Sequence, residues 1–204
     1  MKTITLKTLT PFTLLLALFS AFLLLQENVS EQAYKAAFAS LDVYRSSCPD
    51  ERPRFLAVVD YSKPSYLKRM AVIDLKTGDK SFYLTSHGIN SGDLYATRFS
   101  NTPASSMSSL GLYKVLETYN GIHGKAMRLM GLDPEMNSNA FSRDIVLHAA
   151  DYVSLNYILM NLLTLNNPKI GRSNGCFVVS LQDIDEVAQK LSQGAFVYAW
   201  AEHS

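Results

Sequence analysis

The fold class is indicated most clearly by Arg69-Met70-Ala71-Val72-Ile73-Asp74-Leu75-Lys76-Thr77-Gly78-Asp79-Lys80-Ser81-Phe82-Tyr83-Leu84-Thr85. Its two ends, Arg69 to Leu75 and Ser81 to Thr85, are rich in β-branched and aromatic residues, which favour strands. Lys76-Thr77-Gly78-Asp79 between them has the composition of a hairpin turn. Together with the preceding apolar run from Phe55 to Asp60, the stretch predicts a β-meander.

The rest of the chain adds further strands and two amphipathic helices. The expected strands are Gly111 to Glu117, Ala126 to Met130, Ile145 to His148, Cys176 to Val179 and Ala195 to Trp200. Apolar residues at helical spacing predict a helix from Ser30 to Arg45, with Tyr34, Phe38, Leu41 and Tyr44 on its apolar face. A second helix is expected to start at Ser180-Leu181-Gln182-Asp183, to bury Ile184, Val187, Ala188 and Leu191, and to stop at Gly194. The sequence therefore predicts a mainly β domain with a few helices, a β-rich α+β fold.

The N-terminus forms a separate region. Lys2 and Lys7 precede an almost uninterrupted apolar run from Phe12 to Leu25, which polar residues follow at once. A charged start before an apolar segment is typical of export. We expect residues 1–25 to be a signal peptide or an uncleaved N-terminal apolar helix that anchors the chain in the membrane through residues 12–25. The remainder is expected to work in the periplasm or cell envelope.

Size and charge limit what the remainder can be. A chain of 204 residues with 48% hydrophobic content can enclose one ordinary core. We therefore expect a short helix and linker over residues 26–50 and one catalytic domain over residues 51–204. The formal net charge is only +1, so no broad positive field is available to hold a polyanion. Nucleic acid is not an expected partner.

No nucleotide or metal motif stands out in the sequence. It has no phosphate-binding GxxxxGK[ST] loop, no GxGxxG after a strand and no HExxH helix. His87, His123, His148 and Cys176 are scattered singly and lack the paired spacing of a usual zinc site. We expect neither a metal nor an organic cofactor.

The two cysteines lie in dissimilar surroundings. Cys48 is in the polar stretch Arg45-Ser46-Ser47-Cys48-Pro49-Asp50, whereas Cys176 ends the glycine-rich turn Gly171-Arg172-Ser173-Asn174-Gly175-Cys176 and leads into an apolar run. A disulfide between them remains an alternative for an exported protein. A turn that delivers a cysteine into a strand favours instead a reactive thiol.

Nucleophilic catalysis by Cys176 fits the neighbouring residue types. A thiolate is strongly nucleophilic when an imidazole or aligned backbone N–H groups lower the pKa of the thiol. His148 closes the apolar strand Ile145-Val146-Leu147, and Asn174 and Gly175 offer backbone N–H groups to a developing oxyanion. Arg172 is placed to meet a substrate carboxylate. The alternative for His148 is a histidine with a purely structural role at a strand end.

The polar stretch from Ser86 to Leu110 is rich in Ser, Gly, Asn and Thr and predicts a long loop without regular structure. Loops of this length are often functional, so we expect it to line a substrate groove. The alternative is an exposed surface excursion.

Several separated motifs, in order, resemble the murein L,D-transpeptidase catalytic domain family, a branch of the YkuD-type enzymes. They are Val72-Ile73-Asp74-Leu75-Lys76-Thr77-Gly78, Ser86-His87-Gly88, Ala96-Thr97-Arg98-Phe99-Ser100-Asn101-Thr102-Pro103, Ser109-Leu110-Gly111, Val146-Leu147-His148-Ala149-Ala150-Asp151-Tyr152-Val153-Ser154 and Gly171-Arg172-Ser173-Asn174-Gly175-Cys176. The resemblance covers most of the chain from Asp50 to Trp200.

This resemblance implies a YkuD-like β-sandwich and assigns roles to individual residues. Cys176 resembles the acylated nucleophile, His148 its activating imidazole, and Ser173, Asn174 and Gly175 the turn that carries the oxyanion donors. The backbone carbonyl of Ala149 would orient the other ring nitrogen of His148.

The implied reaction is acyl transfer on the peptide stems of peptidoglycan. Cys176 would release D-alanine from a tetrapeptide stem and pass the acyl group to an amine of another stem. A carboxypeptidase that uses water, a cysteine peptidase acting on proteins and a non-catalytic wall-binding module remain alternatives. The chain departs from the family in having Ala149 where glycine is common and an apparent insertion from Leu162 to Lys169 that would form a lid or extend a helix.

Overall fold

The computed structural model describes residues 29–192 and 194–202. The predicted signal peptide or anchor, including residues 12–25, lies outside this range. The elements, in chain order, are α2 (Glu31–Ser47), β1 (Phe55–Asp60), β2 (Met70–Asp74), β3 (Lys80–Tyr83), β4 (Gly111–Gly121), β5 (Gly124–Gly131), β6 (Val146–Ala149), α3 (Leu155–Leu163), β7 (Phe177–Val179), α4 (Ile184–Leu191) and β8 (Phe196–Trp200). Within these ranges, no helix has the length and apolar character needed to cross a membrane.

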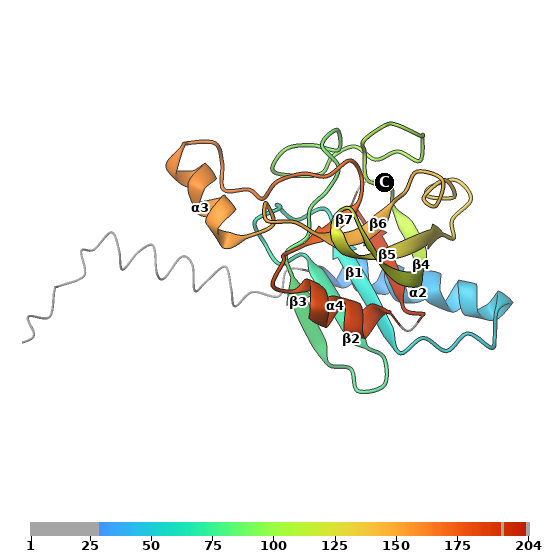
Figure 1. Cartoon of the computed structure of the whole chain (residues 1–204). Helices are drawn as coiled ribbons and strands as arrows, with labels where there is room; N and C mark the ends of the chain where they lie inside the picture. The colour runs from blue at the N-terminus through green and yellow to red at the C-terminus, as the bar shows by residue number, and fades with distance from the viewer. Residues whose placement is uncertain (1–28, 193, 203–204) are drawn as a thin grey trace, which may run out of the picture.

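The strands form one eight-stranded sheet with the order β3-β2-β1-β8-β4-β5-β6-β7 (Figure 1). The predicted meander is confirmed, because β1 pairs antiparallel with β2, and β2 pairs antiparallel with β3. Two neighbouring pairs are parallel, β1 with β8 and β6 with β7. The mainly β prediction is therefore confirmed, but the eight strands are hydrogen bonded into one continuous sheet rather than two separate layers.

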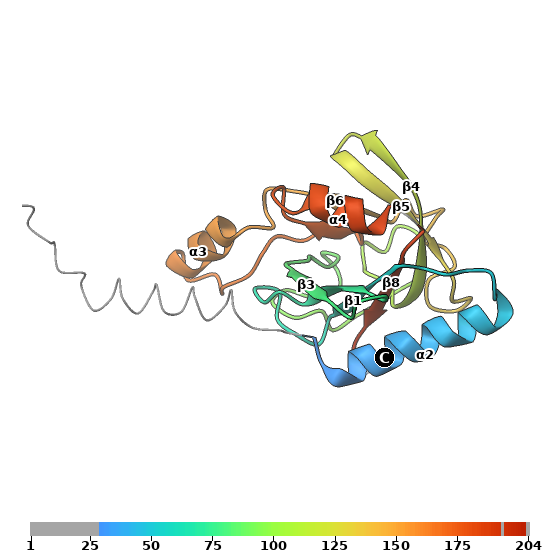
Figure 2. The ribbon, with the colours of Figure 1, turned by 90° about the horizontal axis from the view of Figure 1, so that it is seen from below.

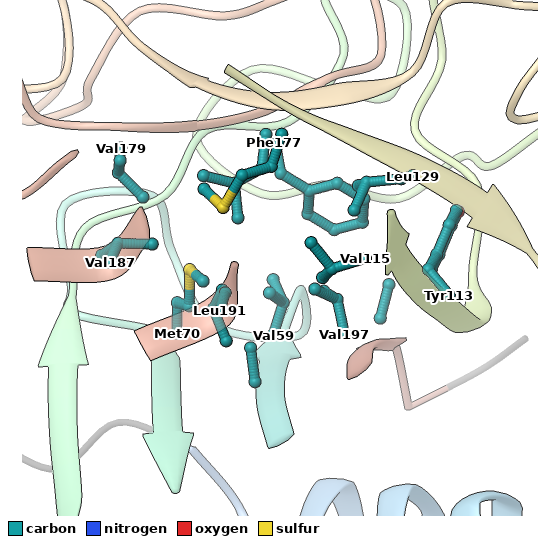
Figure 3. Packing of buried hydrophobic residues seen from close by; sticks show 14 of the residues in the cluster. Val59, Met70, Tyr113, Val115, Leu129, Phe177, Val179, Val187, Leu191 and Val197 are labelled. Carbon is teal, nitrogen blue, oxygen red and sulfur yellow. The ribbon is translucent and has the colours of Figure 1, made fainter. Parts of the chain in front are cut away.

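The sheet curls around its main hydrophobic cluster, which fills the position that the interior of a two-layer sandwich would occupy. This cluster joins side chains of β1, β2 and β8 to side chains of β4 through β7. Helix α4 closes the core, and Figure 3 shows its Val187 and Leu191 among the packed side chains that include Val59 and Met70. The predicted stripe on this helix is confirmed, since Ile184, Val187, Ala188 and Leu191 are all buried.

Helix α2 covers the opposite face of the first strands, as Figure 2 shows. Its N-cap is Ser30, whose Oγ accepts a hydrogen bond from the backbone N–H of Ala33 at 3.3 Å. The predicted apolar face was partly wrong: Phe38 is 40% exposed, and the buried residues are Ala33, Ala37 and Leu41. The small side chains of Ala33 and Ala37 allow the helix to approach the sheet closely. The prediction considered only the large apolar residues and therefore missed these two alanines.

Two further helices differ from what the sequence predicts. Helix α4 begins at Ile184, later than expected, because the hydroxyl of Ser180 accepts from the backbone N–H of Asp183 in a turn that precedes the helix. Helix α3 was not predicted as such. It begins after Ser154, whose Oγ accepts from the backbone N–H of Tyr157 at 3.3 Å, and its last turn contains the start of the apparent insertion at 162–169.

The segment from 86 to 110 contains no named strand or helix, as predicted, whereas the strand predicted to extend to Thr85 ends at Tyr83. It is held to the turn before β7, because the N–H of Ser173 donates to the carbonyl oxygen of His87 at 3.0 Å and the N–H of Ile89 donates to that of Ser173 at 2.7 Å. The long loop therefore lies against the cysteine-bearing turn.

Candidate active site

The pairing of β6 with β7 brings His148 and Cys176 onto one face of the sheet. In the parallel register Leu147 lies opposite Phe177 and His148 opposite Val178. Leu147 and Phe177 belong to the enclosed core. Because successive side chains in a strand point to opposite faces, His148, Val178 and, two residues before Val178, Cys176 all lie on the outer face. Cys176 directly precedes β7, so the two candidate catalytic residues are diagonal neighbours at this strand pair.

A backbone hydrogen bond fixes the orientation of the His148 ring. Its Nδ1 lies 3.0 Å from the carbonyl oxygen of Ala149. A carbonyl oxygen can only accept, so Nδ1 carries the hydrogen and Nε2 is left as the acceptor in the neutral ring. Burial lowers the pKa of His148, the bond to Ala149 raises it in part, and electrostatic repulsion from His123 lowers it again. The net direction is down, so the ring is neutral and able to accept a proton at neutral pH.

Cys176 rests as a neutral thiol. Burial raises the pKa of the thiol, while the backbone N–H of Val146 and the Arg143 guanidinium lower it and the Asp144 carboxylate raises it. The net direction is up from the ordinary value. The Sγ lies 3.6 Å from the carbonyl oxygen of Asp144, to which it donates, so the thiol hydrogen is directed at this carbonyl rather than at the imidazole.

The turn before Cys176 is held together by Ser173. Its Oγ donates to the carbonyl oxygen of Cys176 at 2.7 Å and accepts from the backbone N–H of Gly175 at 3.1 Å. Gly175 has a φ of +117°, and a Cβ at this position would come within 2.7 Å of the carbonyl oxygen of Met107. Only glycine fits both the backbone conformation and the close approach of the long loop.

The remaining two residues of the predicted binding turn differ in their contacts. Arg172 donates to the carbonyl oxygen of Gly92 at 2.9 Å, and its guanidinium lies 3.4 Å from the carboxylate of Asp93. Its charge is therefore partly engaged by the long loop. Asn174 is exposed at the tip of the turn. Both stay predictions as substrate contacts.

Arg143 is a site residue that the sequence analysis missed. Its guanidinium makes four hydrogen bonds, to the carbonyl oxygens of Ser100 and Met107 at 2.7 and 2.6 Å and to the hydroxyls of Ser105 and Ser109 at 3.1 and 3.3 Å. It thus binds the long loop beside Cys176 and lowers the pKa of the thiol. The sequence gives no signal for this role, because the four partners lie more than 30 positions away.

Two other histidines occupy very different places. His123 lies in the turn between β4 and β5, and its ring stacks on that of His148 with centroids 4.5 Å apart and planes 20° apart. His87 is fully buried, and its Nδ1 accepts from the guanidinium of Arg69 at 2.7 Å. Burial, followed by the Arg69 charge, lowers the pKa of His87 to about 3. The sequence does not distinguish the two, because each is a single histidine without a metal-binding motif around it.

Neither cysteine of the chain is paired. Cys48 and Cys176 are free, which contradicts the alternative of a disulfide between them. Cys48 lies at the C-cap of α2, where its backbone N–H donates to the carbonyl oxygen of Tyr44. No group of three or more His, Cys, Asp or Glu side chains is arranged to hold a metal ion within the described part of the chain.

Solved structures of L,D-transpeptidases are similar to this chain at low sequence identity. One from Xylanimonas cellulosilytica has 12% identity and a TM-score of 0.42, over 74% of this chain and 63% of that chain. One from Mycobacterium tuberculosis has 15% identity and a TM-score of 0.44, over 72% and 58%. One from Mycobacterium smegmatis has 13% identity and a TM-score of 0.43, over 72% and 59%. Each match thus spans less than two thirds of the solved chain.

The sequence matches one protein family over most of its length. No curated protein matches the sequence. Residues 25–200 match the family described as the L,D-transpeptidase catalytic domain. This match extends over well more than half of the 204 residues and includes the candidate site. The chain therefore belongs to the L,D-transpeptidase catalytic domain family.

Proposed function

We propose that this protein is a peptidoglycan L,D-transpeptidase in which Cys176 is the nucleophile and His148 its general base. The observation that carries the proposal is the placement of both side chains on the outer face of β6 and β7, with the His148 ring held so that Nε2 is its acceptor. Membership of the L,D-transpeptidase catalytic domain family supplies the reaction class.

The first step forms a thioester. Nε2 of His148 takes the thiol proton once the sulfur turns away from the Asp144 carbonyl, and the thiolate attacks the amide carbonyl that joins diaminopimelate to the terminal D-alanine. The carbon–nitrogen bond breaks, and His148 returns the proton to the leaving amine of D-alanine. The raised thiol pKa supports a proton transfer coupled to attack, rather than a thiolate stored before substrate binds.

Backbone amides of the turn would stabilise the developing oxyanion. The N–H of Ser173 already donates to His87, and that of Gly175 donates to the Ser173 hydroxyl. We therefore assign the oxyanion to the N–H groups of Asn174 and Cys176, and Ser173 and Gly175 to shaping the turn.

The second step transfers the acyl group. An amine of a neighbouring stem attacks the thioester, His148 takes a proton from the amine, and the Cys176 sulfur leaves with that proton. The two stems are then joined through their third residues. Remaining N–H groups of Arg172 are available for a carboxylate of the stem peptide. No metal or organic cofactor takes part in either step.

We further propose that the protein acts outside the cytoplasm, in the periplasm or cell envelope, where peptidoglycan stems are found. The charged start and the apolar run at residues 12–25 support export, as a signal peptide or as an anchor. Residues 26–50 would then connect that segment to the catalytic domain at 51–204, with α2 packed against the sheet of that domain.

The test is incubation of the protein with a purified disaccharide tetrapeptide, followed by mass spectrometry of the products and of the intact protein. We expect loss of D-alanine, a crosslinked dimer and a transient acyl adduct on Cys176. Cys176→Ala should abolish all three while keeping its fold, because one partly buried sulfur contributes little packing. Cys48→Ala is the matched control, since it removes the other free thiol, at the C-cap of α2, and it should retain activity.

Each alternative gives a different result in this experiment. A shortened monomer without dimer identifies a carboxypeptidase with water as acceptor. Cleavage of an unrelated protein substrate would point to a cysteine peptidase. Binding of the tetrapeptide without an acyl adduct would identify a wall-binding module, and turnover that survives in Cys176→Ala would contradict the proposed nucleophile.

A further inference from the structure

His123 contacts the candidate base although nothing in the proposed chemistry requires it. Its ring lies nearly parallel to the ring of His148, with centroids 4.5 Å apart. His148 is on the outer face of the sheet and yet only 4% exposed. The stacked ring of His123 is thus part of what covers the imidazole from solvent.

The conformation of the β4–β5 hairpin places the His123 ring over His148. Gly121 pairs with Gly124, so the turn consists of Ile122 and His123. Gly124 has a φ of +72°, in the left-handed region that glycine adopts at low cost. Ile122 is 95% exposed, whereas the ring of His123 turns back over the sheet onto His148. Ala126, directly opposite His148 in the β5–β6 register, is small and leaves room for this stacking.

Two contacts together restrict the His148 ring. The hydrogen bond from Nδ1 to the Ala149 carbonyl fixes one edge of the ring, and the stacked His123 fixes its plane. A ring held in both ways presents Nε2 in one direction only. We propose that His123 is a positioning residue for His148 and that the tip of the β4–β5 hairpin is a working part of the active site. This inference rests on the proposed function.

The proximity of His123 also affects the pKa of His148. Burial is the largest cause that lowers the pKa of His148, and repulsion from His123 adds to it. Arg128 on β5, opposite Val146, lies on the same face, where its guanidinium pairs with the carboxylates of Glu117 and Asp144. Cys176 directly precedes β7 on this face. His123 therefore helps keep His148 neutral in mildly acidic solution, where the base must remain unprotonated to work.

The experiment compares the full-length protein with His123→Phe, His123→Ala and the matched control Ile122→Ala, which changes the neighbouring residue of the same turn. It measures kcat and KM for the tetrapeptide over a range of pH, and the titration of the His148 ring by NMR. Thermal unfolding of each variant confirms that the hairpin remains folded.

His123→Phe keeps a stacked ring without the charge, so kcat at neutral pH should stay within about twofold of that of the unchanged protein. His123→Ala removes both cover and stacking, so kcat should fall about ten- to hundredfold with KM little changed. The pKa of His148 should rise from the unchanged protein to His123→Phe and again to His123→Ala, and the acid limb of kcat should move with it. Ile122→Ala should match the unchanged protein.

Three results would overturn the inference. One is an unchanged kcat and His148 titration in His123→Ala, the second is an equal loss of kcat in His123→Ala and Ile122→Ala, and the third is an equal loss in His123→Phe and His123→Ala. If the unchanged protein shows no Cys176-dependent turnover, the proposed function fails. The His148 titration then still decides whether His123 positions the ring.

Discussion

Among single residues, Gly175 is restricted both by its backbone conformation and by a close neighbour. Its φ of +117° is unfavourable for any residue with a Cβ, and an added Cβ would also come within 2.7 Å of the Met107 carbonyl oxygen. Gly78 has a similar φ of +82°, but an added Cβ there would meet nothing within 4 Å. Comparing substitutions at Gly78 and Gly175 therefore separates the free-energy cost of the backbone conformation from the cost of the steric clash.

We predict that Gly175→Ala destabilises the protein more than Gly78→Ala does. The change at Gly78 should lower the free energy of unfolding by about 1 kcal/mol, the cost of the left-handed conformation. The change at Gly175 should cost about 1–3 kcal/mol more, because the long loop must move. Denaturant unfolding measures both values, and acylation of Cys176 should be slowed only by Gly175→Ala. Equal destabilisation by the two changes would rule out a steric clash between the added Cβ at position 175 and the Met107 carbonyl oxygen.

Among the elements of the fold, the strand pair β6 and β7 and the long loop form the candidate site, and Arg143 binds that loop. The guanidinium binds the 100–109 part of the loop through four hydrogen bonds and lies close enough to Cys176 to lower the pKa of the thiol. The planar guanidinium group thus binds the loop through its N–H groups, while its charge lowers the pKa of Cys176. Lysine keeps the charge but not the planar group.

We predict that Arg143→Lys and Arg143→Met both loosen the loop, whereas only Arg143→Met also raises the pKa of Cys176. Loss of hydrogen bonds from a charged donor should cost about 1.5–3 kcal/mol of local stability, so amide exchange at 100–109 should speed up about ten- to hundredfold. Alkylation of Cys176 against pH, in a Cys48→Ala background, measures the thiol pKa. Unchanged loop exchange in both variants would contradict the role of Arg143.

At the scale of the whole molecule, a buried histidine links stability to pH. His87 is fully buried against the Arg69 guanidinium, and its pKa is lowered to about 3 from the ordinary 6.5. The unfolded chain therefore binds a proton that the folded protein does not bind between these values. Folded stability is full above pH 6.5 and falls as the pH drops through this window.

We predict that the His87 contribution lowers the free energy of unfolding by about 1.4 kcal/mol per pH unit between pH 6.5 and about 4. His87→Asn keeps an acceptor near the position of Nδ1 but does not titrate, so its acid slope should be shallower by this amount. Urea unfolding at several pH values gives both slopes. His148, whose pKa is also lowered, contributes equally to both proteins and cancels in the difference. Parallel slopes would show that His87 is protonated in the folded state.

The strands, the buried stripe of α4 and the family could be predicted from the sequence, because alternation, turn residues and ordered motifs are local or linear properties of a chain. The sequence also placed Cys176 in a turn before a strand and His148 in another strand. Only the folded structure shows that β6 and β7 are parallel neighbours, that Arg143 binds the long loop and that His123 covers His148. These contacts join positions far apart in the chain, and their partners are common residue types that carry no pattern until folding packs them together.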